Sequence, residues 1–159
     1  KTKPRHGGVF KNYTMSQVED FLSKEEEQEI VEAIRIAEKN TSGEIRVHIE
    51  KTTSQDPYDR AKEVFHELRM DETELKNGVL IYLAVDDHHF IICGDKGIND
   101  LVEPDFWDCT RDVMASQFKK GDFKQGLVDG ILRAGERLQK HFPWQKGDTN
   151  ELSNEISKG

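Results

Sequence analysis

The sequence predicts an α/β protein: a three-layer α/β/α sandwich with a small mixed β-sheet, made of a parallel pair plus an antiparallel hairpin strand, and about four flanking helices. Three observations lead to this fold. Segments with helical and strand periodicity alternate along the first half of the chain. The continuous apolar run VLIYLAV is typical of a central strand covered on both faces. Two aspartates separate this run from HHFIIC, which is close enough for an antiparallel hairpin.

The first helix and the first strand follow each other near the start of the predicted domain. Ser23 and Glu26 have the spacing of a capping box, and apolar residues then recur at helical intervals: Ile30, Ile34 and Ala37. A helix is therefore expected from about Lys24 to Asn40. In the EIRVHIEK that comes next, apolar and polar residues alternate, which is typical of a strand with one solvent-exposed face. We expect this strand to lie at the outer edge of the sheet.

A second helix connects the first two strands and determines their direction. Asp56 and Pro57 supply an N-cap and a first-turn proline, and an apolar stripe follows: Ala61, Val64, Phe65 and Leu68. A strand–helix–strand connection is a right-handed crossover, so the first two strands should be parallel. Asp86 and Asp87 then form the hairpin turn. This turn should lie at the far edge of the sheet, beside the segment that runs from Thr52 to Asp56.

Two helices are predicted after the hairpin. FWDCTRDVMASQF and FKQGLVDGILRAGERLQKHF both have helical periodicity and are separated by a Gly-Asp break. The second contains Gly126, Gly130 and Gly135, each of which costs roughly 1 kcal/mol relative to alanine in a helix. We expect these glycines to allow close contact between the helix and the sheet.

The length of 159 residues is sufficient for one domain with its own core. We assign the domain to residues 15–145. Residues 1–14 contain four Lys/Arg and no acidic residue, in contrast to the acidic remainder, and are predicted to be a disordered leader or tag. Residues 146–159 lack apolar periodicity and are predicted to be a solvated tail.

The acidic composition restricts the classes of partner. The net charge is −8, and from residue 15 onward there are 19 basic and 31 acidic residues. Such a chain should repel nucleic acid but favour a divalent cation or a basic partner. The two cysteines, Cys93 and Cys109, are far apart in sequence, which predicts reduced thiols in a cytoplasmic protein and excludes a zinc site built on cysteine. The longest apolar run is too short for membrane insertion.

The candidate site is centred on GDKGIND, residues 94–100, directly after the third strand. Parallel strands begin at one edge of a sheet, and an antiparallel third strand ends there. The loop should therefore meet a rim formed by Thr41, Ser42, Glu44, Asn77 and Gly97. Calcium binds about six to eight carboxylate, amide and carbonyl oxygens. We therefore predict a divalent cation, preferably calcium, held by Asp95, Asn99, Asp100, Glu103 and Asp105. The spacing is not that of an EF-hand.

Other interpretations of the loop and its surroundings remain open. Gly, Asp and Asn are ordinary turn residues, and Asp105 has the position of a helix cap, so the loop could bind no ligand. A nucleotide-binding phosphate loop is rejected because GDKG lacks the motif and no helix is expected to begin at Lys96. The histidines are expected at the surface or rim. Trp107 and Phe142 should pack in the core or at helix ends, whereas Trp144 should be an exposed contact.

Four segments, TSGEIRVHIE, NGVLIYLA, DKGIND and FKKGDFKQGLVDGI, together resemble the TPM-domain family over about residues 18–142. The resemblance implies a three-layer α/β fold. Some members, including a thylakoid-lumen protein, are described as acid phosphatases, metal-ion binding is described within the family, and other members are membrane-anchored accessory proteins. The sequence differs from the usual pattern at two places. DKGIN stands where many members have G-x-G-L-E, and His88 replaces an arginine that often follows the aspartate pair.

The sequence supports two functional hypotheses. The first is an accessory or interaction module that binds a calcium-like cation through the acidic loop and contacts a protein partner of unidentified kind. The alternative is a metal-assisted acid phosphatase, in which the ion polarises the phosphoryl group. Histidine cannot reproduce the two-pronged donor set with which arginine holds phosphate, and this favours the first hypothesis. An interaction domain without any ion is a third option.

Overall fold

The computed structural model describes residues 21–159, so the leader predicted for residues 1–14 lies outside the described residues. The main elements in chain order are α2 (Lys24–Ala37), β1 (Glu44–Glu50), α3 (Pro57–Glu67), β2 (Gly78–Ala84), β3 (His89–Gly94), α4 (Lys96–Asn99), α5 (Asp108–Lys119), α6 (Phe123–Gln139) and β4 (Ser157–Lys158). Two short 3₁₀ helices, η1 (Glu38–Asn40) and η2 (Met70–Glu72), follow α2 and α3.

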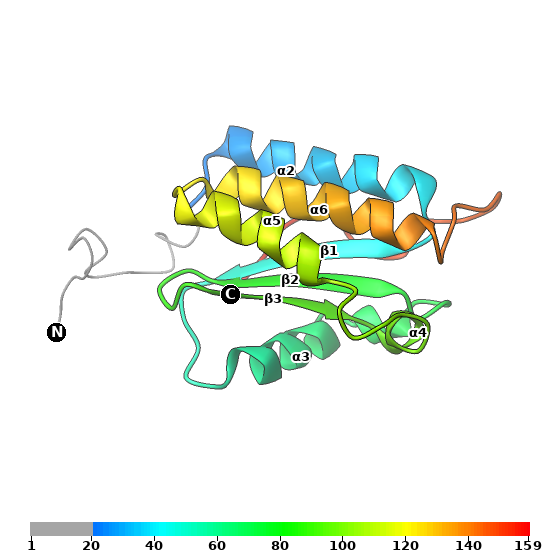
Figure 1. The fold of residues 1–159 in the computed structure, drawn as a ribbon, viewed down its shortest axis with the longest axis horizontal. Helices are drawn as coiled ribbons and strands as arrows, with labels where there is room; N and C mark the ends of the chain where they lie inside the picture. Colours follow the sequence, from blue (N-terminus) through cyan, green and yellow to red (C-terminus); the bar gives the residue numbers. More distant parts are fainter. Residues whose placement is uncertain (1–20) are drawn as a thin grey trace, which may run out of the picture.

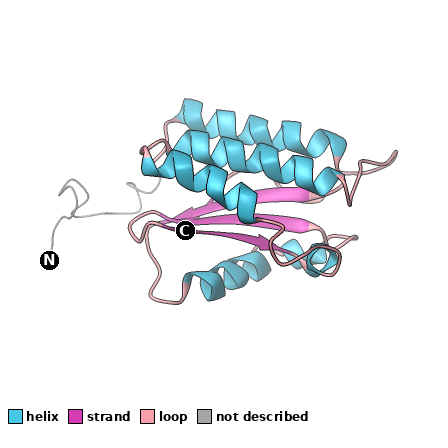
Figure 2. Ribbon diagram, in the orientation of Figure 1, coloured by secondary structure: helices cyan, strands magenta, loops and turns pink. Residues whose placement is uncertain are grey.

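The sheet lies between two helical layers. Its strand order is β3-β2-β1-β4, with β1 parallel to β2 and to β4, and β3 antiparallel to β2. Helices α2, α5 and α6 cover one face, and α3 covers the other (Figure 1, Figure 2). The predicted mixed α/β fold is thereby confirmed, as are the central position of β2 and the hairpin from β2 to β3.

Local sequence signals explain where the first helices begin. Ser23 and Glu26 form the predicted capping box before α2, with Glu26 N donating to Ser23 Oγ at 3.0 Å and Ser23 N donating to Glu26 Oε1 at 2.9 Å. Asp56 caps α3 by accepting from the backbone N–H of Tyr58 at 2.9 Å and of Asp59 at 3.2 Å.

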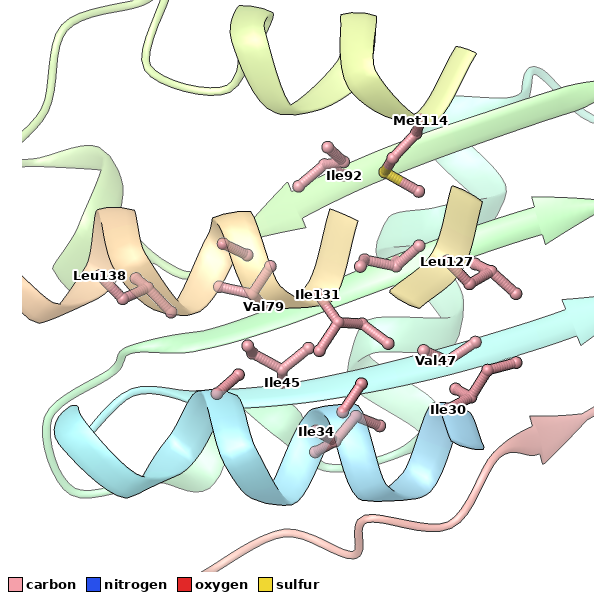
Figure 3. Close-up of a cluster of buried hydrophobic side chains, with 14 of the residues drawn as sticks. Ile30, Ile34, Ile45, Val47, Val79, Ile92, Met114, Leu127, Ile131 and Leu138 are labelled. Atoms are coloured by element: carbon pink, nitrogen blue, oxygen red, sulfur yellow. The ribbon is translucent and has the colours of Figure 1, made fainter. Parts of the chain in front are cut away.

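Two apolar cores lie on the two faces of the sheet. Figure 3 shows the larger one, where side chains from β1 and β2, such as Ile45 and Val79, meet Ile34 of α2 and Ile131 of α6. The smaller core lies under α3 and includes Ala61, Val64, Phe65, Leu80 and Tyr82. Successive residues of β1 and β2 point to opposite faces, so the even-numbered residues of β1 face the α3 side.

The position of β1 differs from its prediction. We expected an outer strand with one solvent-exposed face, but β1 lies between β2 and β4. Three of the polar side chains on its second face are buried, with Glu44 3% exposed and His48 and Glu50 each 5% exposed, and Arg46 is partly buried. The prediction that the histidines lie at the surface or rim is therefore wrong for His48.

The C-terminal segment is the reason that β1 is not an edge strand. Ser157 and Lys158 pair with His48 and Ile49, and Gly159 N donates to Ile49 O at 2.9 Å. The apolar side chains of the segment, Leu152 and Ile156, pack against the smaller and the larger core respectively. Residues 146–159, expected to be a solvated tail, thus contain the fourth strand. Two paired residues and isolated apolar anchors leave no periodic pattern that a sequence reading could detect.

The glycines of α6 allow close packing, but against helices rather than the sheet. A Cβ at Gly126 would overlap Phe118 of α5, and one at Gly130 would overlap Met114 of α5. A Cβ at Gly135 would lie 2.7 Å from the Cβ of Ala37 in α2. The predicted contact of these glycines with the sheet is therefore wrong, because α6 lies between α2 and α5 and uses its small residues to approach both.

Candidate functional site

The acidic loop and its predicted rim do meet at one edge of the sheet. Glu44 and Gly78 are register partners at the starts of β1 and β2, and Asp95 N, just past the end of β3, donates to Gly78 O at 2.9 Å. Glu44 N donates to Asn77 O at 3.3 Å. The antiparallel return of β3 therefore brings residues 95–100 to the edge at which the two parallel strands begin.

Asp95 is the N-cap of a one-turn helix that the sequence reading did not expect. Its Oδ1 accepts from Lys96 N at 2.7 Å, and its backbone carbonyl accepts from Asn99 N at 3.0 Å. Helix α4 therefore begins at Lys96, contrary to the prediction that no helix opens there. The second carboxylate oxygen, Oδ2, is buried and has no hydrogen-bond partner among the described residues. An acceptor of this kind is costly unless something outside the described residues pairs with it.

The neighbours of Asp95 in the loop have structural partners. Lys96 Nζ forms an ion pair with Asp100 Oδ2 at 2.8 Å on the exposed side of α4. Asn99 Nδ2 donates to Gly94 O at 3.0 Å, which turns the side chain back over the end of β3. Gly97 lies directly against the carbonyl oxygens of Leu75 and Lys76, where a Cβ would overlap both. Glycine at this position therefore allows the loop before β2 to approach α4.

The remaining predicted ligands lie on the turn that leads to α5. Glu103 and Asp105 are exposed, and their backbone carbonyls accept from Phe106 N at 3.0 Å and Asp108 N at 3.1 Å. Asp105 does not cap α5, whose N-cap is Trp107 without a side-chain hydrogen bond. Residues 21–159 contain no group of three or more His, Cys, Asp or Glu side chains placed to hold a metal ion. The five predicted ligands share an edge of the sheet but are not gathered around one point.

The rim residues Thr41, Ser42 and Asn77 connect neighbouring segments. Thr41 is 2% exposed, and its hydroxyl donates to Phe142 O and accepts from Gly43 N at 3.0 Å. Asn77 Nδ2 donates to Ser42 Oγ at 3.4 Å, while Asn77 Oδ1 is buried without a partner among residues 21–159. These contacts hold the starts of β1 and β2 together and join them to the end of α6.

Glu44 binds the backbone of the C-terminal segment. Its two carboxylate oxygens accept from Leu152 N at 2.6 Å and from Glu151 N at 2.8 Å. Burial raises the pKa of Glu44 to about 7, although these two N–H groups oppose the shift. Burial likewise raises the pKa of Glu38 to about 8, in opposition to the N–H of Ile45. Both glutamates line a small pocket of 120 Å³ together with Thr41, Ser42, Gly43, Trp144, Asp148, Thr149 and Asn150.

At the far edge of the sheet, the β2–β3 turn lies beside the segment that follows β1, as predicted. Asp87 in the β2–β3 turn accepts from Thr52 Oγ1 at 2.7 Å and from Thr53 N at 3.0 Å. His88 has a left-handed backbone with φ of 57°. Asp87 and Asp95 therefore lie at opposite ends of β3 and do not belong to one site.

The sequence reading missed a buried polar cluster around Glu50. This carboxylate accepts from Arg60 Nε at 2.9 Å and from Tyr82 Oη, and it bonds to His48 Nε2 at 3.0 Å. Burial raises the pKa of Glu50, but the hydrogen bonds from His48, Arg60 and Tyr82 outweigh it and lower the pKa to about 2. The other ring nitrogen of His48 lies 2.9 Å from Ser157 Oγ. The alternation of Arg46, His48 and Glu50 along β1 was the visible signal, but it was interpreted as an exposed face.

The aromatic residues lie as predicted. Trp107 and Phe142 are buried at 7% and 9% exposure, whereas Trp144 is 50% exposed. Among the described residues, no helix has the length and apolar character needed to cross a membrane.

Comparison with known proteins identifies the family. The TPM domain matches residues 15–137, and no curated protein matches the chain. The NMR structure of the BA42 protein from the psychrophilic bacterium Bizionia argentinensis is 64% identical, with a TM-score of 0.85, over 91% of this chain and 99% of that one.

Two more distant solved structures share the fold. The N-terminal domain of a protein from P. gingivalis is 20% identical with a TM-score of 0.62, over 76% of this chain and 78% of that one. The N-terminal domain of the cg2496 protein from Corynebacterium glutamicum is 14% identical with a TM-score of 0.60, over 74% of each chain. With the family match covering most of its length, this chain belongs to the TPM domain family.

Proposed function

We propose that this chain is an accessory interaction module that binds a divalent cation, preferably calcium, at the acidic loop that begins with Asp95. The single observation that carries the proposal is the buried, unpartnered Oδ2 of Asp95 among the described residues. A hard cation would give this oxygen the electrostatic partner that it lacks. The overall excess of acidic residues, with a net charge of −8, favours the approach of such an ion.

The ligand set would be small. Asn99 donates through Nδ2 to Gly94 O, so its Oδ1 remains available as a second ligand. Asp100 would become a third ligand on leaving its exposed ion pair with Lys96, which contributes little to stability. Loop carbonyls and water would complete the coordination shell. A site with few carboxylates corresponds to weak affinity, with a dissociation constant on the order of 10⁻⁴ to 10⁻³ M.

Apolar side chains near the loop would supply the contact with a protein partner. Five large hydrophobic residues are exposed in the described part of the chain, and three of them adjoin this edge of the sheet: Leu75, Leu101 and Trp144. Leu101 follows α4, and the carbonyl of Leu75 packs against Gly97 of α4. Trp144 N donates to Asn40 O at 3.1 Å, next to the rim. An ion that orders the loop would therefore also order part of this surface.

A calcium titration of the full chain followed by backbone NMR tests the cation site. The amide signals of Asp95, Asn99 and Asp100 should move first and saturate in the millimolar range. Asp95→Asn keeps an oxygen for the helix cap but removes the carboxylate charge, and it should weaken binding at least about tenfold. Asp59→Asn on α3, an exposed first-turn aspartate, is the matched control and should leave the titration unchanged. Signals in the loop that do not respond, or an unchanged titration in D95N, would refute the proposal.

The same preparations distinguish the phosphatase alternative. Hydrolysis of a chromogenic phosphate monoester that requires calcium and is lost in the Asp95→Ala, Asp100→Ala double variant would assign the site to metal-assisted hydrolysis. Hydrolysis that persists in the double variant would come from a contaminating enzyme.

A further inference from the structure

A separate pocket lies on the α3 side of β1. It has a volume of 390 Å³, within the range of small-ligand sites, and is lined by Arg46, Leu68, Arg69, Glu72, Thr73, Glu151, Leu152 and Ser153. Its walls come from β1, the turn after α3 and the C-terminal segment. It shares no residue with the acidic loop.

Arg46 in this pocket lacks a counter-ion. It is partly buried, its Nε is inaccessible to solvent and has no hydrogen-bond partner, and it forms no ion pair with any residue from 21 to 159. Burial lowers the pKa of the Arg46 guanidinium. The group nevertheless stays charged, because arginine does not lose its proton in proteins. The Nε–H of Arg46 is thus a buried donor without an acceptor, which is unfavourable, and an anion in the pocket would supply that acceptor.

The other described arginines show what is unusual about Arg46. Five of them form ion pairs with carboxylates: Arg35, Arg60, Arg69, Arg111 and Arg133. Arg137 donates to Phe106 O at 3.2 Å and lies over the Phe106 ring. Arg46 has neither kind of contact among the described residues.

The carboxylates around the pocket are already engaged. Glu44, two residues before Arg46 on the same face of β1, accepts from two backbone N–H groups of the C-terminal segment. Glu72 pairs with Arg69 at 3.2 Å. Glu151 Oε2 accepts from Glu74 N at 3.2 Å. An anion for Arg46 therefore has to come from outside these residues.

We propose that this pocket binds a small aliphatic monocarboxylate, with its carboxylate on the Arg46 guanidinium and its hydrocarbon part against Leu68 and Leu152. Both leucines pack at the margin of the smaller core and present apolar surface. The lining holds two arginines and two glutamates, so its formal charge balances and a monoanion is preferred over a phosphate dianion. Thr73 Oγ1 accepts only a long bond of 3.4 Å from Asn77 N, so the hydroxyl proton is available to the ligand.

The Nε–H signal of Arg46 in the NMR spectrum of the full chain tests this proposal. Isovalerate should shift that signal saturably at constant ionic strength, whereas isovaleramide, which has the same hydrocarbon part but no charge, should not. Isovalerate should also shift the backbone amide signals of Leu152 and Ser153, which line the pocket and report binding in every variant. Arg46→Met removes the charge and should abolish these shifts, and the loss of its Nε–H signal assigns the peak. Arg46→Lys keeps the charge without the two-pronged donor set and should bind at least about tenfold more weakly. Arg35→Met on the outer face of α2 is the matched control and should bind isovalerate normally.

Each other outcome refutes the proposal. A signal that does not respond to isovalerate would mean that the pocket takes no carboxylate. An equal response to isovaleramide or to chloride would mean that the charge–carboxylate contact is not what binds. Stronger binding of inorganic phosphate than of isovalerate would contradict the argument from the balanced lining. Retention of binding in folded R46M, or full binding in R46K, would remove the role of the guanidinium.

Discussion

Glu50 shows how one side chain can stabilise the polar face of a buried strand. It is 5% exposed and accepts hydrogen bonds from Arg60 through both carboxylate oxygens, at 2.9 Å and 3.0 Å, as well as from Tyr82. His48 joins the same carboxylate to Ser157 of β4. Because these partners come from different elements, Glu50 links β1, β2, α3 and the C-terminal segment.

Replacement of Glu50 by glutamine should lower the free energy of unfolding by about 3 kcal/mol, since it leaves the Arg60 guanidinium partly buried without its main counter-ion. Chemical denaturation measures the loss. Glu63→Gln is the matched control, because Glu63 also pairs with Arg60 but is 47% exposed, and its removal should change stability by less than about 1 kcal/mol. Equal losses in the two variants would show that burial does not increase the contribution of the Glu50–Arg60 pair to the free energy of unfolding.

Helix α6 shows how an element can be shaped by its neighbours. Its glycines reduce intrinsic helix stability, yet they allow α2 and α5 to pack closely on either side. The two neighbours differ in how easily they could move to make room for a Cβ atom. Gly130 faces the flexible side chain of Met114, whereas Gly135 faces the backbone of Ala37, including its carbonyl oxygen at 2.9 Å from the position of a Cβ.

Gly135→Ala should therefore destabilise the protein by about 1–3 kcal/mol through overpacking of α6 against α2. Gly130→Ala, in the same helix, should cost less, because the gain in helix propensity is about 1 kcal/mol and Met114 can adopt another rotamer. Thermal unfolding of both variants gives the comparison. A smaller loss in G135A than in G130A would contradict the distinction between backbone and side-chain neighbours.

At the scale of the whole molecule, the C-terminal segment completes the sheet. It pairs with β1, covers Glu44 and contributes Ser157 to the Glu50 cluster. It also lies beyond the part that matches the TPM domain, which ends at residue 137. The ionisation of Glu44 thus depends on residues more than one hundred positions away in the sequence.

Removal of residues 151–159 should lower the free energy of unfolding by about 2–4 kcal/mol, because Leu152 and Ile156 lose their packing and Glu44 loses both N–H donors. The pKa of Glu44, now about 7, should fall towards its ordinary value because burial, its main cause, is relieved. A carboxyl group whose pKa is higher in the folded than in the unfolded chain makes stability fall as pH rises from 4.5 to 7.

The truncated chain should consequently show a shallower fall in stability over this range of pH than the full chain. Denaturation at several pH values and an NMR titration of the Glu44 carboxyl group provide the two measurements. Glu155→Gln, an exposed change within the segment, is the control and should alter neither. If truncation leaves both the stability and the Glu44 titration as they are, the segment does not cover β1 in solution.

The sequence by itself determined the longer elements and the path of the chain through the first three strands. The capping box at Ser23, the apolar run of β2 and the short turn at Asp87 are local signals, and together they led to the correct order of three strands and to the edge at which the acidic loop lies. The loop's glycine and aspartates also indicated a turn, although the short helix after Asp95 was missed.

Only the tertiary structure decided which polar residues are buried and with what partners. Periodicity marks Arg46, His48 and Glu50 as one face of a strand, but it cannot say whether water or a distant segment covers that face. The covering segment holds the strand with two paired residues, a few backbone N–H groups and two apolar anchors, too few to form a pattern. The burial of Glu50 with its partners and of Arg46 without one follows from that covering, because desolvation depends on what packs against a group in space.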